Sequence, residues 1–333
     1  MSGNNHVLSQ HLSVYNLIIK INTLINNQNS TYHTPPYLAI GDTVAITCPA
    51  KKLPRDILDA VTLLESWGLN VVLGETVKAS WHQFAGTDEL RTSDMQRFLD
   101  DPNIKAIFAA RGGYGTIRII DRIDFSKFKN HPKWIIGFSD ITVLHSHIQA
   151  VYKTESIHGQ MPLTIADGSS VSLQTLRKAL FNEALDYTYT SAIKNRSGVA
   201  KGILIGGNLT LLVMMAGSVS EQDYAGKILF LEDVGEYLYS LDRMMWNLKR
   251  SGKLTNLKGL IVGSFTEMKD NDIPFGQTAE QIIMEHVKEF DYPICFNFPA
   301  GHINDNQALI FGRKVNMLVE EQNVSLTYSE FQF

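Results

Sequence analysis

The sequence predicts an α/β protein in two parts, an amino-terminal parallel-sheet (Rossmann-like) domain and a carboxy-terminal β-rich, barrel-like domain. Short, continuously apolar runs that alternate with helical patterns indicate the first part, because strands covered on both faces of a parallel sheet carry no polar side. Closely spaced apolar runs near the end of the chain indicate the second part. A length of 333 residues accommodates two domains of ordinary size.

The elements of the first part follow a polar amino-terminal segment. Residues 1–35 are rich in Asn, Ser and His and are predicted to be an extension, possibly disordered, with a docking helix over residues 12–25 as the alternative. Helical patterns cover residues 54–67 and 88–99. Buried strands are expected at residues 43–47, 69–73, 104–110 and 134–138. Residues 36–190 are therefore expected to form the parallel α/β domain.

The second part, residues 191–333, has a different pattern of apolar runs and helices. Helices are expected near residues 241–249 and 278–290. Apolar runs occur at residues 227–231, 259–265, 294–298, 308–311, 315–319 and 324–328. Few residues separate the last four runs, so we expect a small barrel or curled sheet.

Composition excludes several classes of protein. The chain carries 30 basic and 34 acidic residues, which gives no basic field for a nucleic acid. It has no run of about 18 to 20 apolar residues for a membrane span and no Lys or Arg before Lys20 for a secretory signal, so we expect a cytoplasmic protein. Cys48 and Cys295 are too few for a disulfide framework and are expected to be small buried side chains.

Ser139 lies at a predicted junction between a strand and a helix. The segment over residues 135–142, IIGFSDIT, joins a buried apolar run to an amphipathic helical pattern. A serine on such a sharp turn projects its hydroxyl above the sheet edge, beside a free backbone N–H at the helix start. The hydrolase pattern G-x-S-x-G is incomplete because Ile141 replaces the last glycine. Capping of the helix by Ser139 or Asp140 is the alternative.

A glycine-rich turn, Arg111 followed by Gly112, Gly113, Tyr114 and Gly115, comes directly after a predicted strand. Glycines at this point let the backbone approach a ligand and expose N–H donors. A dinucleotide fingerprint that starts at the second and third glycines would need another glycine at position 118, which is arginine. A nicotinamide oxidoreductase is therefore disfavoured. The remaining interpretations are a loop that donates N–H groups to an oxyanion and a simple tight turn.

Carboxylates end an apolar run in the second part. Glu232 and Asp233 follow residues 228–231, and Glu236 and Asp242 lie further on. Such acids can orient a histidine, bind a metal, act as acid and base, or cap the following helix. The sequence contains no HExxH or comparable run of ligands, so no metal is expected.

Several histidines are candidates for the same site. His145 and His147 are two apart on a predicted helix, so they point away from each other and are poor joint ligands. His158 and His302 lie in glycine-containing segments, where a histidine is most often a surface residue. Chain order favours His302, because Ser139, an acid and then His302 reproduce the order of one large hydrolase group.

Together these segments resemble the LD-carboxypeptidase family of serine peptidases, the muramoyltetrapeptide carboxypeptidases, which includes the microcin C self-immunity peptidases. The resemblance runs over about residues 36–311 and leaves residues 1–35 outside. It rests on residues 41–46, 111–115, 137–142, 205–210, 231–236 and 301–302, in that order.

The resemblance implies a catalytic triad of Ser139, Glu232 and His302. It also implies an oxyanion hole formed by the backbone N–H groups of Gly113 and Asp140. The choice of Glu232 as the triad acid comes from the family motif, since spacing alone leaves it open. A site between the two domains, a homodimer and the absence of any cofactor or metal are further implications.

The implied reaction is hydrolysis of the amide bond that releases terminal D-alanine from murein tetrapeptides, in cytoplasmic recycling of cell-wall peptides. One alternative is hydrolysis of a microcin C-like peptidyl nucleotide, and another is a non-catalytic peptide-binding protein of the same fold. Residues 232–237 and 242–244 resemble the murein branch more closely. The presence of all three triad residues argues against the binding protein.

Overall fold

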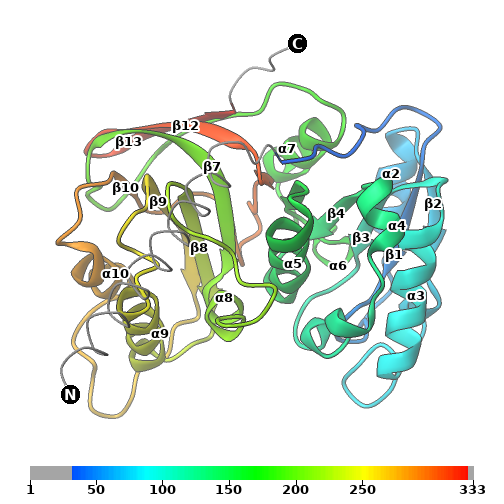
Figure 1. Cartoon of the computed structure of the whole chain (residues 1–333), viewed down its shortest axis with the longest axis horizontal. Helices are drawn as coiled ribbons and strands as arrows, with labels where there is room; N and C mark the ends of the chain where they lie inside the picture. The colour runs from blue at the N-terminus through cyan, green and yellow to red at the C-terminus, as the bar shows by residue number, and fades with distance from the viewer. Residues whose placement is uncertain (1–31, 329–333) are drawn as a thin grey trace, which may run out of the picture.

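A computed structural model of the chain describes residues 32–328, in which two sheets lie side by side with helices around them (Figure 1). The first sheet has the order β11-β5-β4-β3-β1-β2. Its strands are β1 (Thr43–Thr47), β2 (Asn70–Leu73), β3 (Ile104–Ala109), β4 (Trp134–Gly137), β5 (Ser156–His158) and β11 (Leu309–Phe311). All neighbours pair in parallel except β11, which is antiparallel to β5. The predicted amino-terminal parallel sheet is confirmed.

The predicted extension lies mostly outside the described residues, and the helix suggested for residues 12–25 lies outside them entirely. The described chain begins against the first domain. The N–H of His33 donates to the carbonyl of Lys153 over 2.6 Å, and the carbonyl of His33 accepts from the N–H of Glu155 over 2.9 Å.

The helices of the first part are mostly connections between its parallel strands. They are α2 (Leu58–Ser66), α3 (Asp88–Asp100), α4 (Ser126–Asn130), α5 (Thr142–Tyr152), α6 (Pro162–Ile165) and α7 (Ser170–Leu180), with short 3₁₀ turns η1 (Glu75–Val77), η2 (Thr116–Arg118), η3 (Ile120–Arg122) and η4 (Ser139–Ile141). Parallel strands need such crossovers because the chain must return to the same end of the sheet. The start of α3 is capped by Thr87, whose side chain accepts from the N–H of Leu90.

The second sheet is mixed and has the order β10-β9-β8-β7-β12-β13-β6. Its strands are β6 (Asp186–Thr190), β7 (Gly198–Asn208), β8 (Ile228–Val234), β9 (Gly259–Thr266), β10 (Ile294–Cys295), β12 (Lys314–Val319) and β13 (Asn323–Tyr328). β7 to β10 pair in parallel and are joined by α8 (Leu209–Met214), α9 (Leu238–Arg250) and α10 (Ala279–Val287), whereas β6, β12, β13 and β7 pair antiparallel. The β-rich prediction is confirmed, and the antiparallel part curls over β7 (Figure 1).

One strand changes sheets. The apolar run at residues 308–311, predicted to belong to the second domain, forms β11 at the edge of the first sheet, beside β5. The prediction of its sheet was wrong, because an apolar pattern indicates a strand but does not identify the partner strand.

α5 lies between the two sheets (Figure 1). It contacts β4 and β5 of the first sheet and β7 of the second. Residues 142–149 are all buried, including His145, Ser146 and Gln149, so the helix has no solvent face over its first two turns. The predicted amphipathic pattern was therefore wrong for this part of the helix, since a helix enclosed on both sides buries polar residues as well.

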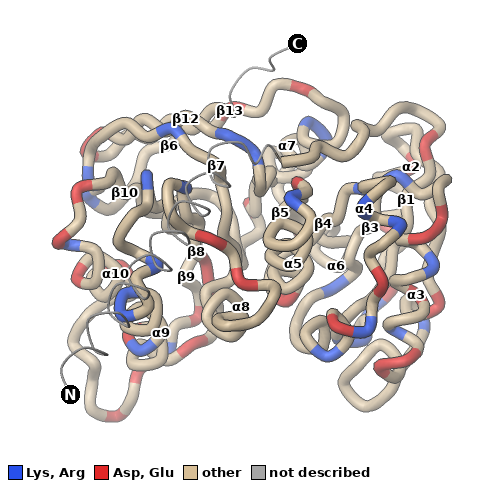
Figure 2. The backbone as a smooth tube through the Cα atoms, in the orientation of Figure 1, with Lys and Arg blue, Asp and Glu red and all other residues tan. Residues whose placement is uncertain are grey.

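The hydrophobic core is shared by both halves of the chain. Phe230 and Phe298 of the second half are buried in the same cluster as Trp134 and Ile157 of the first. Lys and Arg are interspersed with Asp and Glu over both sheets (Figure 2). Across residues 32–328, every helix is too short or too polar to span a bilayer.

Candidate active site

Ser139 occupies a strained turn after β4. Its φ is +62°, in the left-handed region that residues other than glycine rarely adopt. The turn is crowded, because a Cβ at Gly137 would lie 2.9 Å from Cγ1 of Ile141. Neither η4 nor α5 has a side-chain cap, so helix capping does not account for Ser139 or Asp140. The turn therefore has the sharp strand-to-helix geometry that is typical of a nucleophile elbow.

The structure brings Ser139, His302 and Glu232 into one chain of hydrogen bonds. His302 Nε2 lies 3.0 Å from Ser139 Oγ, and His302 Nδ1 lies 2.6 Å from Glu232 Oε2. The serine comes from the first sheet, the glutamate from β8, and the histidine from the loop after β10. The Glu232 side chain is fully buried, whereas the His302 side chain is 20% exposed. With Nδ1–H donating to the carboxylate, Nε2 is free to accept the serine proton.

The environment of His302 favours its protonated form. Burial lowers the pKa of the imidazole, but the charge of Glu232 and its hydrogen bond, helped by Asp233 and Glu267, outweigh burial and raise the pKa above its usual value. The ring of Phe138 meets the imidazole edge-on at 5.0 Å. Charge and packing therefore both hold the imidazole between the carboxylate and the hydroxyl.

Glu232 and Asp233 point to different partners. Asp233 Oδ1 accepts from the N–H of Val234 and from Asn208 Nδ2, and Oδ2 accepts from the N–H and hydroxyl of Thr210. Burial raises the pKa of Asp233, and the charge of Glu232 adds to the rise. Because consecutive residues of a strand face opposite sides, only Glu232 can reach His302. His302 therefore contacts Glu232 and not Asp233, in agreement with the acid expected from the resemblance.

Asn306 and His158 support the histidine loop; Asn306 was missed by sequence reasoning, and His158 was considered but expected at the surface. Asn306 Oδ1 accepts from the N–H of Gly301 over 2.8 Å and lies 3.2 Å from His158 Nε2. His158 is fully buried in β5 and is therefore not the surface residue that was expected. A Cβ at Gly301 would collide with Ser264 Oγ, so only glycine fits there. The sequence signal for Asn306 was weak, because a polar residue four positions after a histidine has no periodic meaning in a loop.

The predicted oxyanion loop packs directly on the serine turn. A Cβ at Gly112 would lie 3.0 Å from Ser139 Cβ and 3.3 Å from the backbone nitrogen of Asp140. Gly113 has φ +106° and is exposed, so its backbone can face a ligand. The N–H of Asp140 lies in the first turn of a helix, where backbone donors have no intrahelical partner. Gly112, the neighbour of the predicted donor Gly113, thus packs on Ser139 and beside the backbone nitrogen of the second predicted donor, Asp140.

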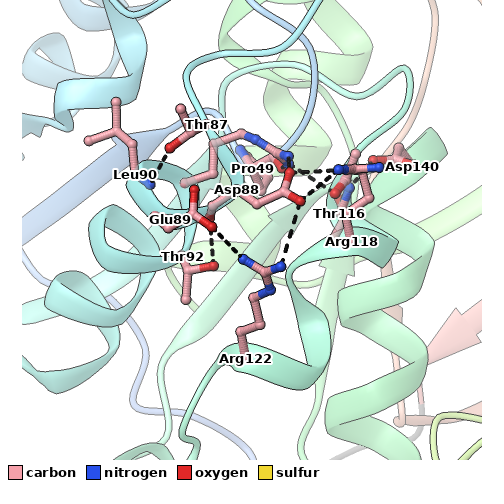
Figure 3. Close-up of polar contacts among 12 residues, drawn as sticks. Pro49, Thr87, Asp88, Glu89, Leu90, Thr92, Thr116, Arg118, Arg122 and Asp140 are labelled. Carbon is pink, nitrogen blue, oxygen red and sulfur yellow. Dashed lines mark hydrogen bonds and ion pairs between the residues drawn. The ribbon is translucent and has the colours of Figure 1, made fainter. Parts of the chain in front are cut away.

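Buried polar contacts hold this loop in place (Figure 3). Arg91 of α3 is fully buried and donates to the carbonyls of Pro49 and Gly115, over 2.5 and 2.9 Å, and to Asp88. From the other side, the carboxylate of Asp140 accepts from the N–H of Thr116 over 2.8 Å. Burial raises the pKa of Asp140, although these hydrogen bonds and nearby cations oppose it. The loop is therefore fixed at its end by two charged side chains.

The remaining predicted candidates lie elsewhere. His145 Nε2 bonds the carbonyl of Gly137 and His147 Nδ1 bonds Ser220, which confirms that the two do not act together. Cys48 and Cys295 are free and fully buried, as expected, and burial raises the pKa of each thiol to about 12. Among residues 32–328, His, Cys, Asp and Glu form no cluster of three or more that could hold a metal ion.

Comparisons with known proteins identify the family of this chain. Residues 44–159 match the model of the LD-carboxypeptidase amino-terminal domain, and residues 201–317 match that of the carboxy-terminal domain. A probable murein peptide carboxypeptidase of Bacillus subtilis is 35% identical over 88% of this chain and 94% of its own length.

Two solved structures are similar in fold. The muramoyltetrapeptide carboxypeptidase of Oxalobacter formigenes has a TM-score of 0.78 at 28% identity, over 87% of this chain and all of the other. The microcin C7 self-immunity protein MccF has a TM-score of 0.78 at 21% identity, over 88% of this chain and 98% of its own, and shows the fold alone.

Proposed function

Because this chain belongs to the LD-carboxypeptidase family of peptidases, we propose that it is a serine peptidase with Ser139, His302 and Glu232 as its triad. The hydrogen-bonded chain from the serine hydroxyl to the buried carboxylate is the observation that carries this proposal. A serine hydroxyl at its free pKa is a poor nucleophile and needs such a base.

In the proposed reaction, His302 Nε2 takes the proton of Ser139 as Oγ attacks the amide carbonyl. Glu232 holds the imidazole in the tautomer with hydrogen on Nδ1 and stabilises the imidazolium. The imidazolium then gives its proton to the leaving amine, which departs and leaves an acyl-enzyme. Water, deprotonated by His302, hydrolyses this ester and restores the serine.

The backbone N–H groups of Gly113 and Asp140 would bind the oxyanion of the tetrahedral intermediates. Support comes from the packing of the glycine loop on Ser139 and from the position of Asp140 in a first helical turn. A donor of this kind typically contributes about 2.7 to 4 kcal/mol to transition-state stabilisation. No cofactor or metal takes part in these steps.

The proposed substrate is a murein tetrapeptide, from which the enzyme releases terminal D-alanine. The names of the Bacillus and Oxalobacter relatives support this choice over a peptidyl nucleotide. The resemblance described above also implies a cytoplasmic enzyme that acts as a homodimer, and sedimentation of the purified chain would test the dimer.

Release of D-alanine from a purified murein tetrapeptide tests the proposal directly. We expect Ser139→Ala to lower kcat at least about 1,000-fold, because triad residues act as a unit. Ser93→Ala, an exposed serine of α3, is the matched control and should retain full activity. Turnover by Ser139→Ala at the wild-type rate would refute the mechanism. Cleavage of a peptidyl nucleotide alone would support the alternative substrate, and cleavage of neither would support a binding protein.

A further inference from the structure

Two cations flank the proposed oxyanion loop. The side chain of Lys51 crosses Gly113, since a Cβ there would lie 2.5 Å from Lys51 Cδ and 3.2 Å from Cε. Arg111 immediately precedes Gly112, which packs on Ser139, and its Nη1 donates to the carbonyl of Lys52 over 2.6 Å. Both side chains are therefore at the loop that contacts the nucleophile.

These cations lack the partners that neighbouring arginines have. Arg91 and Arg118 both pair with Asp88, and Arg97 pairs with Asp94. Within residues 32–328, by contrast, neither Lys51 nor Arg111 has a carboxylate at ion-pair distance, although both are half-buried. A partly desolvated charge is costly without a counter-ion, so this position favours an anionic ligand.

The charges in the site are separated. On the histidine side, the negative charges of Glu232, Asp233 and Glu267 act on His302. On the loop side, Lys51 is near enough to Asp140 for its charge to oppose the rise in the Asp140 pKa that burial causes. An anionic group of a substrate would be repelled by the first side and attracted by the second.

We propose that Lys51 and Arg111 bind the free terminal carboxylate of the substrate, which restricts cleavage to the last residue of a peptide. This inference rests on the proposed function. One Cα separates that carboxylate from the leaving nitrogen, so the carboxylate carbon lies only about 2.5 Å from the nitrogen. Its binding groups must therefore lie beside the nucleophile, where these two cations are. Carboxylate binding by Arg and Lys through charge-assisted hydrogen bonds is strong and directional.

Two matched substrates test this site. One is the tetrapeptide with free terminal D-alanine, and the other is the same peptide ending in D-alaninamide. We expect the wild-type chain to prefer the acid in kcat/KM by at least about 100-fold. Lys51→Met and Arg111→Met should each lower kcat/KM for the acid by about 10 to 100-fold and change that for the amide less than about two-fold.

Lys52→Met is the matched control for the loss of one charge. Lys52 is adjacent to Lys51, but its ammonium donates to Ser80 Oγ over 3.1 Å. The variant keeps the backbone carbonyl that Arg111 uses, so its preference for the acid should equal that of the wild type. Lys51→Arg, which keeps the charge, should recover most of the preference.

The outcomes separate the two proposals. An equal loss on acid and amide in the variants would overturn the carboxylate site, since it would indicate a role in oxyanion binding or folding. Unchanged preference in both variants, or a wild-type chain that cleaves acid and amide equally, would also overturn it and leave the peptidase intact. Failure of the wild type to cleave either peptide would reject the proposed function, and the carboxylate site with it.

Discussion

Glu232 is a fully buried carboxylate with one dominant partner. Its Oε2 contacts His302, while its Oε1 has no hydrogen-bond partner among the described residues. Since an ionised group with few hydrogen bonds is costly to bury, the carboxylate gains most when the imidazole is protonated. The arrangement therefore favours the imidazolium that the proposed attack by the serine would form.

Replacing this carboxylate by an amide should change both the rate and its pH dependence. We expect Glu232→Gln to lower kcat by about 1,000 to 10,000-fold, because the amide no longer enforces the required tautomer. The neutral form of His302 is the base, so activity falls as pH drops below the His302 pKa. Loss of the charge that raises this pKa should move the acidic limb of kcat/KM to lower pH.

Asp233→Asn is the control for that variant. Asp233 faces the opposite side of β8 and contributes less to the His302 pKa, so the limb should move less and kcat should remain close to the wild-type value. If the acidic limb of kcat/KM lay at the same pH in Glu232→Gln and in the wild type, the assigned role of Glu232 would be contradicted.

At the level of residues, the sequence could identify candidate catalytic side chains but not which side chains they contact. Ser139 and His302 were predicted from a turn and from chain order, and the structure joins them through one hydrogen bond. Asn306 was not found and His158 was expected at the surface, because their contact links positions 148 residues apart. Such a pair is created by the crossing of β11 beside β5, which no local pattern indicates.

The glycine loop is the element on which the proposed chemistry depends most. Its glycines bring the backbone to Ser139, and its end is held by Arg91 and Asp140. Because Arg91 is fully buried, its contacts are shielded from solvent and cannot be replaced by water. The geometry of the loop is thus a property of α3 as much as of the loop.

Arg91→Met should weaken both the fold and the reaction. Among the described residues, removal of the guanidinium leaves the carbonyl of Pro49 without a donor and leaves the carbonyl of Gly115 and the Asp88 carboxylate with only their hydrogen bonds from Arg118. We expect the loss of this buried charged group to cost about 3 to 5 kcal/mol. A displaced loop should also lower kcat about 10-fold or more with little change in KM. Urea unfolding and D-alanine release measure the two effects.

Arg118→Met provides the comparison. Arg118 bonds the same Asp88 but is 45% exposed, and exposed ion pairs contribute about 0 to 1 kcal/mol. If folded Arg91→Met kept the wild-type kcat, the loop would keep its geometry without the arginine, and the prediction would be wrong.

Elements with strong local patterns were predicted well. β1 was predicted at its observed limits, and α3 differs from the prediction by one residue. β7 was not predicted as a strand, because its glycines at 202, 206 and 207 interrupt the apolar pattern. Two of them have packing reasons: a Cβ at Gly206 would collide with the carbonyl of Phe230, and one at Gly207 would lie 2.6 Å from Thr142 Oγ1.

At the scale of the whole molecule, the end of β7 joins the two halves of the site. Thr142 begins α5 just after the Ser139 turn, and its Oγ1 accepts from the N–H of Asn208 over 3.0 Å. Asn208 in turn pairs across the sheet with Glu232. The serine and the glutamate are therefore placed relative to each other through this close contact.

Gly207→Ala should disturb that junction. The added Cβ meets Thr142 at a backbone φ of +136°, so we expect a loss of about 2 to 4 kcal/mol in the free energy of unfolding and a lower kcat. Gly252→Ala, with φ +74° and no atom within 4 Å of the new Cβ, should cost about 1 kcal/mol and leave kcat unchanged. Equal effects of the two variants on kcat would contradict the role of the junction.

The crossing of β11 into the first sheet has a consequence for synthesis of the protein. Until residues 309–311 leave the ribosome, β5 is an edge strand with unpaired backbone groups, although the other strands of its sheet are already made. The first domain therefore cannot finish folding before residues 309–311 are made, long after its other strands. Because His302 lies just before this strand, the last residue of the proposed triad is synthesised together with the strand that completes the sheet edge. If the proposed triad is correct, the nascent chain is inactive until its scaffold is closed.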